Sequence, residues 1–74
     1  MLTTKMKRAR LESKLTQQEL GMKVGVTKAT IGRYEKVRRK PSYDVMLRLS
    51  DVLHMPGDEL LELIDDSSFS QNNE

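Results

Sequence analysis

The sequence predicts an all-α domain of five short helices, and three observations support this fold class. Apolar residues recur at intervals of three and four along most of the chain, as they do on one face of a helix. Glycine and proline interrupt this periodicity at several points, so each helix is short. A chain of 74 residues can bury only one small core. We expect one domain over residues 1–64, followed by a polar, disordered tail over residues 65–74.

The first helix is expected over residues 2–14, with Thr3 or Thr4 as its N-cap and Met6 on its inward stripe. Arg10 lies one turn after Met6 and therefore points toward the core, where a lone guanidinium would be costly. We expect Arg10 to have a partner of opposite charge.

Two short helices joined at a glycine are expected over residues 16–24 and 27–36. Each range opens on a threonine that is suited to cap a helix. Gly25 lies between them and can adopt the positive φ that a helix C-terminus often needs. Gly21 precedes it by one turn, where a side chain would hold the two helices apart. The pair should therefore cross closely.

Two further helices complete the prediction. The fourth opens at Pro41 and Ser42, because serine can cap a helix and proline stops the preceding one. Its core stripe consists of Met46, Leu49 and Leu53. The fifth is expected from Pro56 to about Ile64, because proline suits the first turn of a helix.

Seven apolar or small positions occur with a distinctive spacing around the glycine turn. They are Leu20, Gly21, Val24, Gly25, Val26, Ile31 and Tyr34. This spacing resembles the DNA-binding helix-turn-helix of the phage repressor and Cro family. The resemblance covers about residues 5–61 and implies a five-helix, lambda-repressor-like domain. It also implies binding to double-stranded operator DNA, usually as a homodimer on an inverted repeat, and regulation of transcription, mainly as a repressor.

The outward face of the helix over residues 27–36 is the expected surface for reading bases. A helix face with small residues and flanking donors can enter the major groove, where each base pair presents distinct acceptors. The side chains expected to read bases are Lys28, Ala29, Thr30 and Arg33. Arg33 is the candidate for two hydrogen bonds to one guanine.

A second group of side chains is expected to contact DNA phosphates, which fix the register of the protein on the duplex. The resemblance implies this role for Gln17, at a helix start whose backbone N–H groups lack partners. Four positive charges follow the reading helix directly, and a solvated charge run is the alternative for them. The expected phosphate contacts are Gln17, Gln18, Thr27, Lys36, Arg38, Arg39 and Lys40.

Two structural roles are also expected. Glu35 is the partner for Arg10, because the resemblance implies a partly buried ion pair between an arginine and a glutamate at these positions. Apolar residues off the core stripes leave more apolar surface than so small a core needs, which a second subunit would cover. The candidates for this dimer interface are Leu47, Val52, Leu61 and Ile64.

The charge of the chain is strongly polarised. Its net charge is only +2, but residues 1–40 carry 12 basic residues against three acidic ones, and residues 41–74 carry one basic residue against eight acidic ones. Such a molecule should turn its basic half toward a polyanion. The basic half is also the half that contains the two helices joined at glycine.

Composition argues against other classes of protein. With no cysteine and one histidine, the chain offers neither a thiolate metal site nor a nucleophile with its base, so we expect no enzyme, metal or cofactor, and no small-molecule ligand is evident. No apolar run approaches the roughly 20 residues that span a bilayer, so we expect a cytoplasmic, nucleoid-associated protein. Two alternatives remain: an antitoxin-type or other partner-binding module that binds DNA for autoregulation, and a DNA-binding part of a longer regulator.

Overall fold

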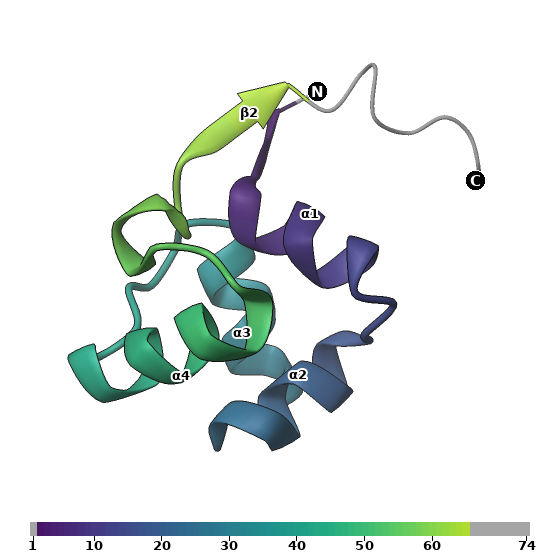
Figure 1. The fold of residues 1–74 in the computed structure, drawn as a ribbon, viewed down its shortest axis with the longest axis vertical. Helices are drawn as coiled ribbons and strands as arrows, with labels where there is room; N and C mark the ends of the chain where they lie inside the picture. The colour runs from purple at the N-terminus through teal and green to yellow at the C-terminus, as the bar shows by residue number, and fades with distance from the viewer. Residues whose placement is uncertain (1, 66–74) are drawn as a thin grey trace.

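The computed structural model describes residues 2–65 and builds them mainly from α-helices (Figure 1). The elements follow in the order β1 (Leu2–Thr4), α1 (Lys5–Glu12), α2 (Gln17–Val24), α3 (Lys28–Glu35), α4 (Tyr43–Leu53), the 3-10 turn η1 (Gly57–Glu59) and β2 (Leu63–Asp65). The predicted helical class is confirmed, although four α-helices replace the expected five in this part of the chain. No helix within these residues has both the length and the apolar character that crossing a bilayer requires.

The described residues begin with a strand, where the sequence predicted the first turn of a helix. β1 pairs with β2 in antiparallel fashion, and the facing residues are Leu2 and Asp65, Thr3 and Ile64, and Thr4 and Leu63. The side-chain oxygen of Thr4 accepts a hydrogen bond from the backbone N–H of Lys7 at 3.1 Å and so caps α1. Figure 1 shows the two ends of the described chain side by side in this small sheet.

The predicted fifth helix is absent. Pro56 has an extended backbone with ψ of 140°, so it precedes η1 as a cap and does not lie within a helical turn. β2 then ends at Asp65, a residue that the prediction assigned to the tail. The remainder of that tail, residues 66–74, lies outside the described residues.

Backbone hydrogen bonds from α1 explain why residues 60–65 do not continue as a helix. The backbone N–H groups of Lys5 and Met6 have no acceptors within α1, because they belong to its first turn. They donate instead to the carbonyl oxygens of Glu62 and Leu60, both at 2.9 Å. These two carbonyls therefore satisfy the start of α1, and the chain after η1 runs antiparallel to β1.

The two helices that meet at a glycine form as expected. Thr16 and Glu19 make both hydrogen bonds of a capping box at the start of α2, at 2.8 and 3.0 Å. At its end Gly25 has φ of 82°, and the N–H groups of Gly25 and Val26 both donate to the Gly21 carbonyl oxygen. A Cβ on Gly21 would lie 2.6 Å from the Val26 carbonyl oxygen. The close crossing of α2 and α3 therefore requires glycine at position 21.

The core lies where α1, α2, α3, α4 and η1 converge. Its buried apolar residues are Met6, Leu20, Val24, Ile31, Tyr34, Leu49, Leu53 and Leu60. α4 contributes Leu49 and Leu53, whereas Met46 is only partly buried at the edge of the cluster. Each helix thus buries one stripe, and the opposite side of α3 is left open to solvent.

Candidate nucleic-acid interface

α3 is amphipathic, with one side packed against the domain and the other side exposed to solvent. Ile31, Tyr34 and Glu35 are buried against the rest of the domain. On the outward side Lys28, Ala29 and Arg33 are exposed. With Gly32 and the following Lys36 they form what we call the reading face, a helix surface of two small residues flanked by three cationic side chains.

The N-terminus of α3 is held by two threonines. The side-chain oxygen of Thr27 accepts the backbone N–H of Thr30 at 3.1 Å, and the two hydroxyl oxygens lie 2.9 Å apart. Thr27 was expected to contact phosphate and Thr30 to contact bases. Both hydroxyls take part in the cap, and Thr30 is partly buried, so their first role is to fix where the reading face begins.

A shallow depression runs along the reading face and joins three parts of the chain. It is lined by Gln17 of α2, by the reading face, and by Arg38 of the following loop. A second depression near the start of α2 is lined in part by Gln18, Lys14 and Lys28. Arg39 and Lys40 are exposed in the same loop. Three of the four predicted base contacts and three of the seven predicted phosphate contacts therefore line one depression.

The loop after α3 turns sharply through Val37. Its φ is 56°, in the left-handed region that a β-branched residue rarely adopts. The backbone N–H of Val37 donates to the Tyr34 carbonyl oxygen, and that of Arg38 donates to the Arg33 carbonyl oxygen, both at 2.9 Å. This turn ends α3 and leads directly into the basic run that carries Arg38 and Arg39.

A buried ion pair lies behind the reading face. Arg10 Nε donates to Glu35 Oε2 at 2.6 Å, and Arg10 Nη2 donates to Glu35 Oε1 at 3.3 Å. A third guanidinium nitrogen, Nη1, donates to the Leu15 carbonyl oxygen at 2.8 Å. Arg10 thereby joins α1, the loop before α2, and the last residue of α3.

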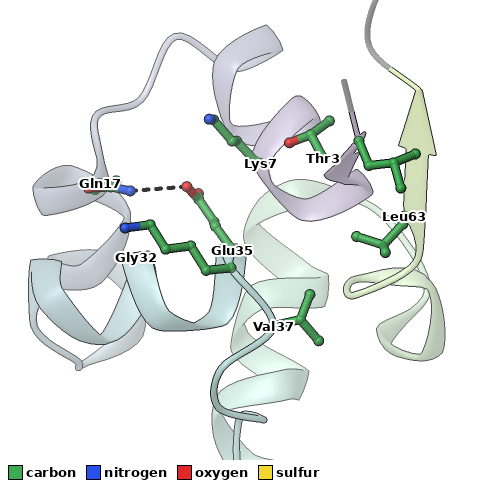
Figure 2. A pocket seen from close by; sticks show the side chains of 9 residues that line it. Thr3, Lys7, Gln17, Gly32, Glu35, Val37 and Leu63 are labelled. Carbon is green, nitrogen blue, oxygen red and sulfur yellow. Dashed lines mark hydrogen bonds between the residues drawn. The ribbon is translucent and has the colours of Figure 1, made fainter.

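Gln17 extends this network to the start of α2. Its Nε2 donates to Glu35 Oε1 at 3.0 Å, as the dashed line in Figure 2 marks. Gln17 was expected to contact a phosphate at this helix start, and that contact stays a prediction, while its side-chain nitrogen donates to a carboxylate within the protein. This hydrogen bond could not be predicted from the sequence, because the two residues lie 18 positions apart on different helices. Gln17 thus couples the start of α2 to the end of α3.

Sequence reasoning gave Lys7 no role, but the structure places it next to this network. Lys7 lines a pocket together with Gln17, Glu35 and Lys36, on the side of α3 that faces α1 and β1. In Figure 2 its side chain reaches from α1 toward the side where Gln17 and Glu35 meet. The one available signal was the concentration of basic residues in the first half of the chain.

Lys5 belongs to the opposite, acidic side of the molecule. Its Nζ lies 2.8 Å from Glu62 Oε1 and 3.3 Å from Glu59 Oε1. The hydrogen bonds that Lys5 donates to the carboxylates of Glu62 and then Glu59 raise the pKa of Lys5 above its ordinary value of 10.5. These contacts connect α1 to the segment around η1. The charge of Lys5 is therefore paired with two carboxylates within the protein.

The expected dimer residues are dispersed over α4, the turn after η1 and β2. Leu47 on α4 is 48% exposed, whereas Val52 and Leu61 are partly buried and pack against the core. Ile64 is partly buried in β2, opposite Thr3. The helix whose face was to supply part of this interface does not form.

Known proteins resemble this chain over most of its length. The family model described as helix-turn-helix matches residues 6–60. The uncharacterized HTH-type transcriptional regulator YqaE of Bacillus subtilis (strain 168) is 34% identical over 62 residues, which are 84% of this chain and 53% of that protein. The uncharacterized HTH-type transcriptional regulator YobD of the same organism is 32% identical over 66 residues, 89% of this chain and 59% of that protein. The chain therefore spans a little over half the length of these relatives.

One solved structure with the same arrangement contains DNA. It is the crystal structure of the P22 c2 repressor protein in complex with synthetic operator 9T in the presence of Tl+. The similarity has a TM-score of 0.72 with 32% sequence identity and covers 77% of this chain and 86% of that chain.

Proposed function

The chain belongs to the helix-turn-helix family, and from this membership we propose that it is a transcriptional regulator, in the first place a repressor, that binds double-stranded DNA sequence-specifically. The observation that carries the proposal is the reading face of α3, whose exposed Lys28, Ala29 and Arg33 lie opposite its buried residues. An α-helix with this surface fits the major groove. The crystal structure of the P22 c2 repressor protein with a synthetic operator supports the same role here.

Recognition then divides between base contacts and backbone contacts. Arg33 is exposed at the middle of the reading face and can present two N–H groups to O6 and N7 of one guanine. Lys28 and Ala29, nearer the start of α3, contact a neighbouring base and a thymine methyl. Lys36 and Arg38, where the depression leaves α3, contact phosphates and set the register.

A homodimer on an inverted repeat is the second part of the proposal. Two copies of α3 would enter successive major grooves about 34 Å apart, which requires a two-fold interface away from the reading face. Without a fifth helix, the surface that supports such an interface is the groove between α4 and η1, whose apolar lining comes from Met46, Leu60 and Leu61 and whose lining also includes Lys40. Leu47 lies exposed on the same helix. In this arrangement the protein acts on nucleoid DNA in the cytoplasm.

Selection of bound duplexes from a randomised pool at about physiological salt tests the proposal, because non-specific binding is weak there. The expected result is an enriched inverted repeat whose half-sites lie one helical turn apart. Enrichment of a single half-site would retain specific binding and contradict the dimer. No enrichment, with no retention of duplex, would contradict DNA regulation by this chain alone and favour a partner-dependent module.

A further inference from the structure

A pocket lies beside the reading face, between α1, the two-stranded sheet and the end of α3 (Figure 2). Its lining is divided. Figure 2 shows Lys7, Gln17 and Glu35 gathered on one side, with Val37 and Leu63 on the other. Val37 and Leu63 are 43% and 54% exposed. The pocket thus presents a polar end and an apolar wall to solvent.

The polar end carries excess positive charge. Lys7 and Lys36 are exposed, and within residues 2–65 neither ammonium group has an ion-pair partner. Among residues 2–65, Glu35 is the one carboxylate that lines the pocket, and both of its oxygens accept hydrogen bonds, from Arg10 and from Gln17. The negative charge is therefore compensated, while the two lysine charges remain available to an anion.

The pocket and the depression on the reading face share a wall. Gln17, Gly32 and Lys36 line both of them. A DNA strand that follows the edge of the groove occupied by α3 would therefore continue past Lys36 toward Lys7. Its backbone offers a phosphate for the ammonium groups and a deoxyribose for the apolar wall.

We propose that this pocket is an additional DNA-backbone site, in which Lys7 and Lys36 hold one phosphate and Val37 and Leu63 contact the adjoining deoxyribose. The inference rests on the proposed DNA binding and extends its footprint from α2 and α3 to α1 and β2. The chemistry recognised is a phosphate ester attached to a sugar. A free nucleotide has the same chemistry, and the shared wall with the reading face favours the duplex as its source.

Salt dependence tests the contribution of Lys7. Each phosphate contact lowers the logarithm of affinity by about 0.9 per tenfold rise in salt. Lys7→Ala should reduce the slope of the logarithm of affinity against the logarithm of salt concentration by about 1. It should also weaken binding to the selected operator and to random duplexes by the same factor. Lys23→Ala is the matched control, because Lys23 is exposed in the last turn of α2 and lies outside the pocket while carrying the same charge.

Neutral methylphosphonate linkages placed one at a time along the operator locate the contact. At one linkage beyond the bases under α3, substitution should weaken wild-type binding but leave the affinity of Lys7→Ala unchanged. If every linkage affects Lys7→Ala and wild type equally, the pocket holds no phosphate. Equal slopes for Lys7→Ala and Lys23→Ala, with wild type still bound to its operator, would overturn this inference and leave the proposed function intact.

Titration with a deoxynucleoside monophosphate shows whether the pocket binds a free nucleotide or the backbone of a DNA duplex. The expected result is no saturable shift in the unfolding temperature at millimolar nucleotide, with Lys7→Ala identical to wild type. A saturable shift that Lys7→Ala abolishes, together with an unchanged salt slope for duplex binding, would assign the pocket to a free nucleotide and overturn the backbone contact.

Discussion

Arg10 and Glu35, which are separated by 25 positions in the sequence, form a buried two-point ion pair with Nε and Oε2 2.6 Å apart. The pair connects the middle of α1 to the residue at which the reading helix ends. Gln17 donates to the same carboxylate. The orientation of α3 relative to α2 therefore depends on polar contacts as well as on the apolar core.

Breaking this pair from either side should be costly. Arg10→Met or Glu35→Leu alone should lower the free energy of unfolding by about 3–5 kcal/mol, because the remaining charge stays buried without its partner. The double variant should lose much less than the sum of the two. Chemical denaturation of all four proteins in a double-mutant cycle measures this. A loss of only about 0.5 kcal/mol, as for an exposed pair, would contradict the structural role.

Two glycines should respond to alanine in opposite directions. A Cβ on Gly21 would lie 2.6 Å from a backbone oxygen of Val26, so Gly21→Ala should lower stability by about 1–3 kcal/mol. A Cβ on Gly32 would meet its nearest neighbour, Gln17 Nε2, at 3.6 Å, an ordinary contact. Gly32→Ala should therefore raise stability by up to about 1 kcal/mol through helix propensity. The unfolding temperatures of both variants test this prediction. Equal changes in the two variants would rule out the close crossing at Gly21.

Val37→Gly should stabilise the domain. Val37 has φ of 56°, and a left-handed conformation costs an L-residue about 1–2 kcal/mol. Glycine removes that cost but adds about 0.5–1 kcal/mol of unfolded-state entropy, so a net gain of about 0.5–1 kcal/mol is expected. Val37→Ala is the control, since it keeps a Cβ and hence the strain. A midpoint of urea unfolding that falls in Val37→Gly would contradict the assignment.

The contacts of Lys5 predict a pH dependence. Its pKa in the folded protein is raised above 10.5 by Glu62 and Glu59, so the folded state binds this proton more tightly. The stabilisation is fully present below 10.5 and is lost as the pH rises through the folded value. The difference in Tm between wild type and Lys5→Gln should therefore be constant from neutral pH to about pH 9 and shrink at higher pH. A difference that grows with pH would contradict this sign.

Substitutions at predicted base contacts and at predicted phosphate contacts should have different effects on DNA binding. Arg33→Ala should cost about 1–3 kcal/mol on the operator and relax specificity at one base pair. Arg38→Ala with Arg39→Ala should instead lower the salt slope by about 2, at 0.9 per contact, with specificity retained. Titrations on matched and mismatched duplexes at several salt concentrations measure both. An unchanged slope for the double variant would refute phosphate contacts by this loop.

The helix-turn-helix could be predicted because its determinants are local. The capping box of Thr16 and Glu19, the positive φ of Gly25 and the small residue at Gly21 each act over a few positions. The prediction of a fifth helix from Pro56 was wrong because a non-local contact decides the structure of this segment. Its carbonyl groups at Leu60 and Glu62 accept hydrogen bonds from the backbone N–H groups of Met6 and Lys5. The apolar periodicity within the segment carries no information about these bonds.

The candidate site divides in the same way. Projection along one helix found the exposed positions of the reading face, Lys28, Ala29 and Arg33, because helical geometry decides which way a side chain points. Lys7 was given no role, since its place in the pocket beside Gln17 and Glu35 depends on how α1 packs against the end of α3. The phosphate contact of Gln17 stays a prediction, and the bond from its side-chain nitrogen to Glu35 could not be foreseen because it joins two helices.

The sequence by itself determined the helical class, the turn between α2 and α3, the polarity of charge and the residues on the outward side of α3. Each of these follows from spacing and capping over one or two helical turns. Only the tertiary structure decided that the two ends of the described chain pair as strands, and that Gln17, Arg10 and Glu35 share one network. Such contacts join residues far apart in the chain, and their partners are selected by packing of the whole core.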